Sequence, residues 1–137
     1  MTSKPLTLVI DTDVFFASLV QTDAHHHKIP SLYKKLSKEA TIYVSDLILA
    51  ETATLLKRRI SKDLANNFLQ KFEGESFIVV YQNEKLLRLA KEYFLRQNSK
   101  DVTFFDCANM AIAESYQVEA IFSFDKGYER NGFRLLK

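Results

Sequence analysis

Short apolar stretches alternate along this chain with longer segments in which apolar residues recur every three or four positions. The apolar stretches predict β-strands at residues 6–10, 41–44, 76–81 and 118–124, with a short last strand at 133–136. The first stretch shows no polar alternation, which indicates a strand buried on both faces at the centre of a parallel sheet. Strands that alternate with helices predict an α/β fold with a mainly parallel central sheet of four to five strands flanked by helices.

The periodic segments predict helices over residues 14–21, 30–38, 46–60, 61–72 and 104–116, and a long helix after Asn83. Ser45 and Asn83 have the residue types of N-caps, and Thr103 with Asp106 has the form of a capping box. Gly74 is expected to close the fourth helix. In the helix after Asn83, the inward stripe is expected to comprise Leu86, Leu89, Ala90, Tyr93 and Phe94. The helix at 104–116 is apolar almost all round, so we expect it to be central and buried.

Length and composition limit the classes of protein to consider. The 137 residues suffice for one domain, 1–137, with an ordinary core. The single cysteine, Cys107, excludes an internal disulfide framework and favours a reducing, cytoplasmic location. No stretch reaches membrane-spanning length, so no membrane association is expected. The net charge of +2 is too small to indicate a nucleic-acid partner by itself.

Local charge could still bind phosphate. The basic residues Lys57, Arg58, Arg59 and Lys62 cluster where the third predicted helix ends. The helix macrodipole alone favours cations at that position, so a phosphate-binding cluster is only one of two explanations. Three adjacent histidines, His25 to His27, suggest a metal site, but neighbouring residues on a helix point about 100° apart. A solvated or capping role is therefore the favoured interpretation of the histidines.

Acidic residues occur where the predicted strands end. Asp11 and Asp125 each follow an apolar strand, and the carboxyl ends of parallel strands meet at one edge of a sheet, where ligands bind. Glu51 and Asp106 lie on helices that begin at the same edge. Taken singly, each acid could be a turn, cap or solvated residue. Four converging carboxylates would repel one another unless some were protonated or a cation lay between them.

An oxygen-only set of ligands favours Mg²⁺ or Mn²⁺, and the sequence has no Cys/His spacing typical of zinc sites. Such ions lower the pKa of a bound water and stabilise charge on a phosphoryl group, and two of them act together in many phosphodiester-cleaving sites. A second interpretation is a haloacid-dehalogenase-like phosphatase, because Asp11-Thr12-Asp13 has its Asp-x-Asp form. The Asp125-Lys126 region fits the downstream Lys and acidic pair of those enzymes poorly.

Four segments of the chain, in order, resemble the motifs of the PIN-domain family, most closely those of its VapC-type toxins. The segments are residues 9–15, 46–52, 103–108 and 121–128, so the resemblance covers essentially the whole length. It implies a Mg²⁺- or Mn²⁺-dependent endoribonuclease that hydrolyses phosphodiester bonds of single-stranded RNA. It also implies a homodimer and a cognate antitoxin that holds the enzyme inactive. A PIN-like module that binds RNA or protein without cutting remains the non-catalytic alternative.

The resemblance also assigns roles to single residues. It implies an acidic catalytic set of Asp11, Glu51, Asp106 and Asp125, with the metal ions held mainly by Asp11, Asp106 and Asp125. Thr12 and Ser123 would be supporting hydroxyls that bind water or orient carboxylates. Many relatives carry Asn where this chain has Asp13. An additional carboxylate there could join the metal shell or cap the following helix, and we favour the cap.

Overall fold

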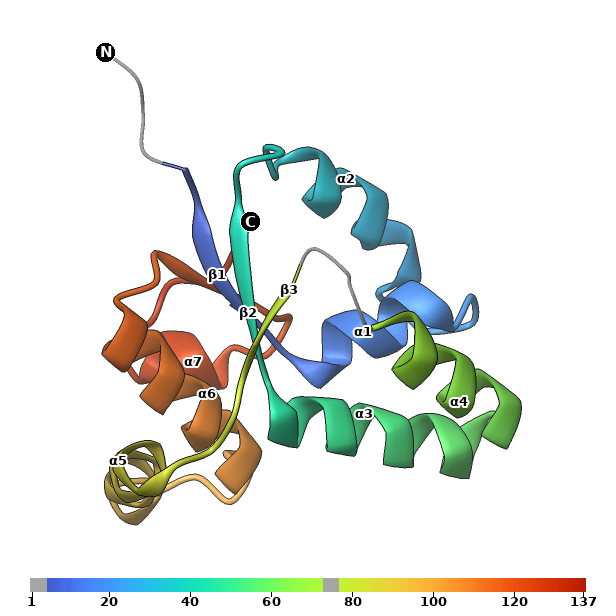
Figure 1. The fold of residues 1–137 in the computed structure, drawn as a ribbon. Helices are drawn as coiled ribbons and strands as arrows, with labels where there is room; N and C mark the ends of the chain where they lie inside the picture. Colours follow the sequence, from blue (N-terminus) through green and yellow to red (C-terminus); the bar gives the residue numbers. More distant parts are fainter. Residues whose placement is uncertain (1–4, 73–76) are drawn as a thin grey trace.

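The computed structural model, which describes residues 5–72 and 77–137, is built around a parallel sheet of four strands (Figure 1). The strands are β1 (Thr7–Ile10), β2 (Thr41–Ser45), β3 (Phe77–Val80) and β4 (Ala120–Phe122), in the spatial order β3-β2-β1-β4. Val9 of β1 pairs with Tyr43 of β2 on one side and with Ile121 of β4 on the other. The predicted α/β fold with the first strand inside the sheet is confirmed.

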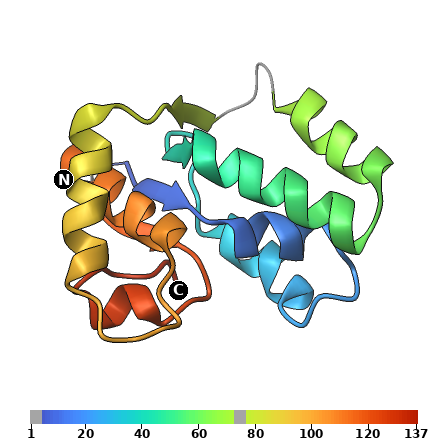
Figure 2. The same cartoon turned by 90° about the horizontal axis from the view of Figure 1, so that it is seen from below.

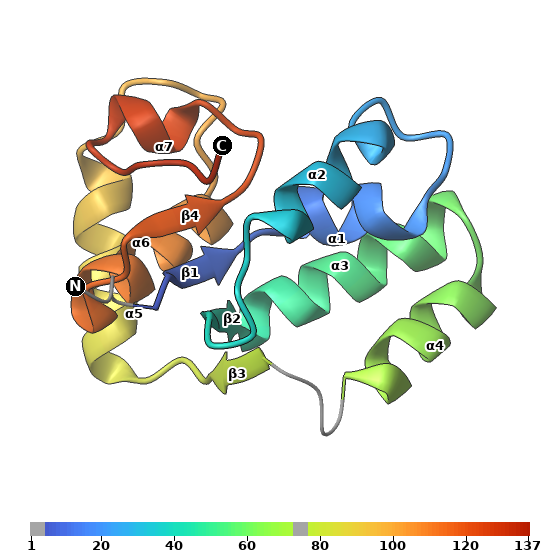
Figure 3. The same ribbon diagram turned by 90° about the horizontal axis from the view of Figure 1, so that it is seen from above.

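Helices cover both faces of the sheet. The helices are α1 (Thr12–Leu19), α2 (Ile29–Lys34), α3 (Asp46–Arg59), α4 (Lys62–Lys71), α5 (Glu84–Leu95), α6 (Phe104–Tyr116) and α7 (Gly127–Arg130), with a 3-10 turn, η1 (His26–Lys28). Figures 2 and 3 show α1 to α4 on one side of the strands and α5 to α7 on the other. Within the described residues, every helix is too short or too polar to cross a membrane.

The lack of alternation in the first strand reflects a core on each face of the sheet. Leu8 and Ile10 belong to a cluster with Phe15 and Ile48, on the side of α1 and α3. Val9 points the other way and packs in a second cluster with α6. All residues from 106 to 113 of α6 are buried, as its apolar sequence predicted. The strand that ends at Asp11 is therefore fixed from both sides.

The last strands are shorter than predicted. β4 ends at Phe122, because the backbone N–H of Phe124 donates to Oδ2 of Asp13 at 2.8 Å instead of continuing the ladder. The predicted strand at 133–136 was wrong in extent, since only Leu135 forms a bridge, with Ile121. Within the described residues the sheet accordingly has four strands, the lower end of the predicted four to five.

Several helix predictions also need correction. The first helix begins at Thr12 rather than Val14, because Asp11 caps it, and α2 ends at Lys34 rather than near residue 38. Phe94 was predicted to face inward, but it is 45% exposed. α4 ends at Lys71, and Gly74, which was expected to close it, lies outside the described residues.

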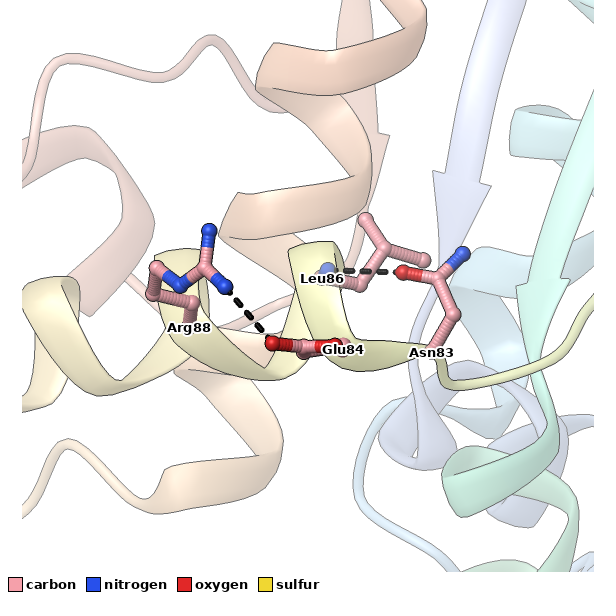
Figure 4. A network of polar contacts seen from close by, with 4 residues as sticks. All are labelled: Asn83, Glu84, Leu86 and Arg88. Atoms are coloured by element: carbon pink, nitrogen blue, oxygen red, sulfur yellow. Dashed lines mark hydrogen bonds and ion pairs between the residues drawn. The ribbon is translucent and has the colours of Figure 1, made fainter.

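The predicted N-caps of the later helices are in place. Ser45 accepts a hydrogen bond from the backbone N–H of Leu47 at 3.1 Å. At the start of α5, Oδ1 of Asn83 accepts from the N–H of Leu86 at 2.8 Å, and Arg88 pairs with Glu84 at 2.8 Å (Figure 4). The Ser45 and Asn83 contacts satisfy backbone donors that the first turn of a helix would otherwise leave unpaired.

Replacing Asn83 by alanine is expected to lower the free energy of unfolding by about 1 kcal/mol, because the cap of α5 is lost. Asn67→Ala is the matched control, since Asn67 is exposed in the interior of α4 and alanine favours a helix there. Urea unfolding followed by circular dichroism measures both. Equal destabilisation by the two variants would contradict the capping role.

Candidate active site at the carboxyl edge of the sheet

Asp11 stands directly after β1 at the carboxyl edge of the sheet. Its backbone N–H donates to the carbonyl of Phe122 at 3.0 Å, and its Oδ1 accepts from the N–H of Thr12 at 2.8 Å, so it is the N-cap of α1. The side chain is only 5% exposed. Because strand, cap and burial all constrain it, this carboxylate has a fixed position.

A cleft of about 280 Å³ opens at this edge and brings together the four acids singled out in the sequence, Asp11, Glu51, Asp106 and Asp125. Thr12 and Asp13 also line it. The other lining residues are Phe16, Asp23, His25, Leu55, Arg59, Asp101 and Thr103. Residues from widely separated parts of the chain thus form one predominantly acidic site.

Asp106 and Asp125 each keep one oxygen occupied by a local hydrogen bond. Oδ2 of Asp106 accepts from the N–H of Thr103 at 2.9 Å, which completes the predicted capping box. Oδ1 of Asp125 accepts from the N–H of Gly127 at 2.8 Å. A side chain at position 127 would crowd this contact, since its Cβ would lie 3.1 Å from Oδ1 of Asp125. The turn and cap roles therefore position these acids.

The two predicted supporting hydroxyls lie against the carboxylates. Thr12 donates from Oγ1 to Oε1 of Glu51 at 2.5 Å. Oγ of Ser123 lies 3.2 Å from Oδ2 of Asp11 and 2.9 Å from Oδ2 of Asp13. These contacts connect α1 to α3 and to the segment that follows β4.

Asp13 does not cap the helix, so that interpretation was wrong. Its Oδ2 accepts from the hydroxyl of Ser123 and from the backbone N–H of Phe124, and the cap of α1 is Asp11. Its Oδ1 is buried with no hydrogen-bond partner among the described atoms. Asp13 thus ties α1 to the end of β4 and leaves one carboxylate oxygen unsatisfied.

Sequence reasoning missed the role of Tyr128. This side chain is completely buried, and its hydroxyl donates to Oδ2 of Asp11 at 2.7 Å and lies 3.3 Å from Oδ1 of Asp106. Nδ2 of Asn109 donates to the same hydroxyl at 3.1 Å. The signal available in the sequence was Asn109, a polar residue one turn after Asp106 in an otherwise apolar helix, which needs a buried polar partner.

Burial and mutual repulsion raise the pKa values of several acids in the cleft. Burial, and next the charge of Asp13, raises the pKa of Asp11 well above its usual value, although the Tyr128 hydrogen bond opposes the shift. Burial also raises the pKa of Glu51 and of Asp106. The pKa of Asp13 rises to about 6, mainly through burial. The repulsion expected from the sequence is therefore present in the folded cleft.

The donor set of the cleft fits a divalent cation in its chemistry. All the candidate ligands are carboxylate oxygens, which suit Mg²⁺ or Mn²⁺. The raised pKa values of Asp11 and Asp106 and the unpartnered Oδ1 of Asp13 both indicate that a cation would stabilise the cleft. In residues 5–72 and 77–137, however, no three acidic, histidine or cysteine side chains already stand close enough to hold one ion.

The basic cluster and the histidines separate in the fold. Arg59 lines the cleft with its guanidinium 5.7 Å from the centre of the Phe16 ring, whereas Lys57, Arg58 and Lys62 are exposed outside it. His25 lines the cleft and stacks on Phe124 at 4.3 Å. Nδ1 of His26 donates to the carbonyl of Ala17 at 2.6 Å, and His27 is exposed. The three histidines do not face a common point.

Comparison with known proteins places this site in a family context. The model of the PIN domain family matches residues 8–134. No curated protein gives a significant sequence match. VapC20 from Mycobacterium tuberculosis, described as a sarcin-ricin loop cleaving toxin, is 22% identical with a TM-score of 0.83, over 92% of this chain and 95% of that one.

Two further solved structures have similar folds. VapBC2 from Rickettsia felis, bound to a DNA fragment from its promoter, has a TM-score of 0.68 at 15% identity and covers 96% of this chain and 98% of its own. FitAcB from Neisseria gonorrhoeae has a TM-score of 0.71 at 14% identity, over 95% and 96% of the two chains. At these identities, the likeness shows the fold.

Replacing Asp13 by asparagine is expected to stabilise the metal-free protein at about pH 7, by about 1–3 kcal/mol from the size of the pKa shift. The folded-state pKa of about 6 exceeds the ordinary 3.8, so the stability linked to Asp13 is lost as the pH rises through that range. The gain should shrink at about pH 4, where Asp13 is protonated in the folded protein.

Chemical denaturation in EDTA at both pH values measures this difference. Glu92→Gln, which removes an exposed carboxylate of α5 outside the cleft, is the control and should have little effect at either pH. A stabilisation by Asp13→Asn that did not depend on pH would contradict the electrostatic explanation.

Proposed function

Because this chain belongs to the PIN-domain family, we propose that it is a metal-dependent endoribonuclease that hydrolyses phosphodiester bonds of single-stranded RNA. The observation that carries the proposal is the convergence of Asp11, Glu51, Asp106 and Asp125 in one cleft. The whole chain, 1–137, would act as one nuclease domain. The similar fold of VapC20, described as a sarcin-ricin loop cleaving toxin, supports the reaction class.

Asp11, Asp106 and Asp125 are the proposed ligands of Mg²⁺ or Mn²⁺, and Glu51 ligates the ion or polarises water. A bound divalent cation supplies positive charge next to the phosphoryl group and makes water a better nucleophile at neutral pH. Support comes from the oxygen-only lining and from the raised pKa values of Asp11 and Asp106.

The other residues of the site orient these acids. Tyr128 holds Oδ2 of Asp11 from within the core, so Asp11 cannot rotate freely. Thr12 holds Glu51 from the start of α1. Arg59 lines the same cleft and offers guanidinium donors to a phosphate oxygen of the substrate. In this arrangement the acids and the arginine contact the substrate region, and the buried hydroxyls set their geometry.

The phosphatase interpretation is disfavoured by the contacts of Asp13. An acid/base partner for a nucleophilic Asp11 needs an oxygen directed at the substrate, whereas Oδ2 of Asp13 is taken up by Ser123 and Phe124 and its Oδ1 is buried. Trapping a phosphoryl-aspartate at Asp11 would instead support the phosphatase interpretation.

The non-catalytic PIN-like module is the second candidate function. One observation favours it, since within the described residues no three ligands are already arranged around a common point. Tight RNA binding without cleavage at saturating Mn²⁺ would select this module over the nuclease.

The biological role proposed is that of a cytoplasmic toxin controlled by an antitoxin protein. The structural likeness to VapC20, VapBC2 and FitAcB supports this role. A homodimer is proposed as well. Exposed apolar side chains on α5 support self-association, because Leu87 is 46%, Phe94 45% and Leu95 80% exposed.

Asp11→Asn and Asp106→Asn are each expected to reduce Mn²⁺-dependent cleavage of single-stranded RNA by more than about 100-fold. Even the outer-shell partners of metal ligands typically contribute about 10–100-fold, so a ligand itself should contribute more. Asp63→Asn, at the exposed first turn of α4, is the matched control and should keep full activity. Cleavage of labelled RNA on denaturing gels measures the loss, and circular dichroism verifies the fold. Unchanged cleavage by Asp11→Asn would falsify the assignment.

Expression of the wild-type chain in a bacterial host is expected to stop growth, whereas the Asp11→Asn variant should not. The reason is that toxicity in this proposal comes from RNA hydrolysis alone. Optical density after induction measures the effect, with equal protein levels verified by immunoblot. Equal toxicity of both chains would show that the toxicity does not depend on the acidic cleft.

A further inference from the structure

A second pocket, of about 290 Å³, lies next to the acidic cleft and shares a wall with it. Ser123 and Phe124 line this pocket, while the next residue, Asp125, lines the cleft. His25, which also lines the cleft, stacks on the Phe124 ring at 4.3 Å. The wall between the two cavities is therefore the short segment that follows β4.

The lining of the second pocket combines lysines with apolar side chains. Lys28 and Lys126 contribute amines from η1 and from the segment before α7, and Nζ of Lys28 lies 5.9 Å from the centre of the Phe124 ring. Ser31 adds a hydroxyl. The apolar part of the lining is formed by Leu32, Leu135 and Leu136, all partly buried.

The pocket has uncompensated positive charge. Its acidic residue, Glu129, already pairs with Nζ of Lys137 at 3.0 Å. Across residues 5–72 and 77–137, the ion pairs found are this one and Arg88–Glu84, so neither Lys28 nor Lys126 has a carboxylate partner. The acidic cleft and its neighbour are thus opposite in charge.

This difference in charge has a consequence for a polyanionic substrate. A phosphodiester chain is repelled by the carboxylates of the cleft outside the reacting group, so its binding energy must come from surfaces nearby. Unpaired lysines supply phosphate contacts, and apolar side chains next to them supply a surface for a base. The second pocket offers both the lysines and the apolar surface, and its lining residues Phe124 and Lys126 flank the proposed ligand Asp125 in the chain.

We infer that the pocket lined by Lys28, Phe124 and Lys126 binds a nucleotide of single-stranded RNA that neighbours the bond cleaved in the acidic cleft. This inference rests on the proposed nuclease function. The lysines contact the phosphate of that nucleotide, and Leu32, Leu135 and Leu136 contact its base. An acidic peptide of a protein partner could use the same charge, but the wall shared with the cleft favours the RNA.

The first experiment is an NMR titration of the ¹⁵N-labelled wild-type chain in EDTA with adenosine 5′-monophosphate. Shifts of the backbone amides of Ser31, Phe124 and Leu135 are expected, and inorganic phosphate should shift fewer of them because it has no base. Equal shifts with inorganic phosphate would overturn the nucleotide assignment. Shifts with a glutamate-rich peptide but none with the nucleotide would overturn it in favour of a protein partner.

Charge reversal tests the lysines. The double variant Lys28→Glu/Lys126→Glu should weaken nucleotide binding at least about tenfold, since two phosphate contacts are replaced by repulsion. Lys91→Glu/Lys85→Glu on α5, outside the pocket lining, makes the same change in net charge and should bind as wild type. Equal losses in the two double variants would overturn the inference.

Kinetics then connect the pocket to cleavage. With Mn²⁺ and an RNA oligonucleotide, Lys28→Glu/Lys126→Glu should raise KM at least about tenfold with little change in kcat, because contacts away from the reacting bond are lost. An unchanged KM would overturn the inference. A wild-type chain that binds the nucleotide in EDTA but never cleaves RNA would instead overturn the proposed nuclease function, so the two failures are distinguishable.

Discussion

Burial of like-charged carboxylates at one edge of the sheet is the constraint on which the rest of the structure depends. Asp11 is 5% exposed, and the negative charges of Asp13 and Asp106 raise its pKa in addition to burial. Such a cluster destabilises a folded protein unless neutral donors or a cation offset it. The scaffold therefore has to hold these groups firmly without neutralising them.

The fold achieves this with hydroxyl and amide groups from several elements. Tyr128 reaches Asp11 from α7, Ser123 reaches Asp11 and Asp13 from the end of β4, and Thr12 reaches Glu51 from α1. Neutral donors fix the positions of the carboxylates without adding positive charge, whereas a paired lysine or arginine would compensate the net negative charge of the site. The arrangement leaves stability below its possible maximum, as is common where a site must stay reactive.

Charge is also divided between neighbouring cavities. The cleft is lined by acids with Arg59 at its side, and the adjoining pocket by lysines and apolar residues. The short segment after β4 separates them, and Asp13 fixes that segment through Phe124. A single buried acid at the start of α1 thus sets both the wall of the cleft and the wall of its neighbour.

The sequence by itself determined the α/β class, the inside position of the first strand, the N-caps of the later helices and the four candidate acids, because these depend on local periodicity and on residue types next to strand ends. Tertiary structure alone decided the extent of β4, the contacts of Asp13 and the part played by Tyr128. In each case the deciding hydrogen bond joins residues more than a hundred positions apart. It also separated Arg59 from Lys57, Arg58 and Lys62, because the guanidinium of Arg59 packs over the Phe16 ring of α1 at the cleft. Local pattern identifies candidate groups, and only packing fixes which of them meet.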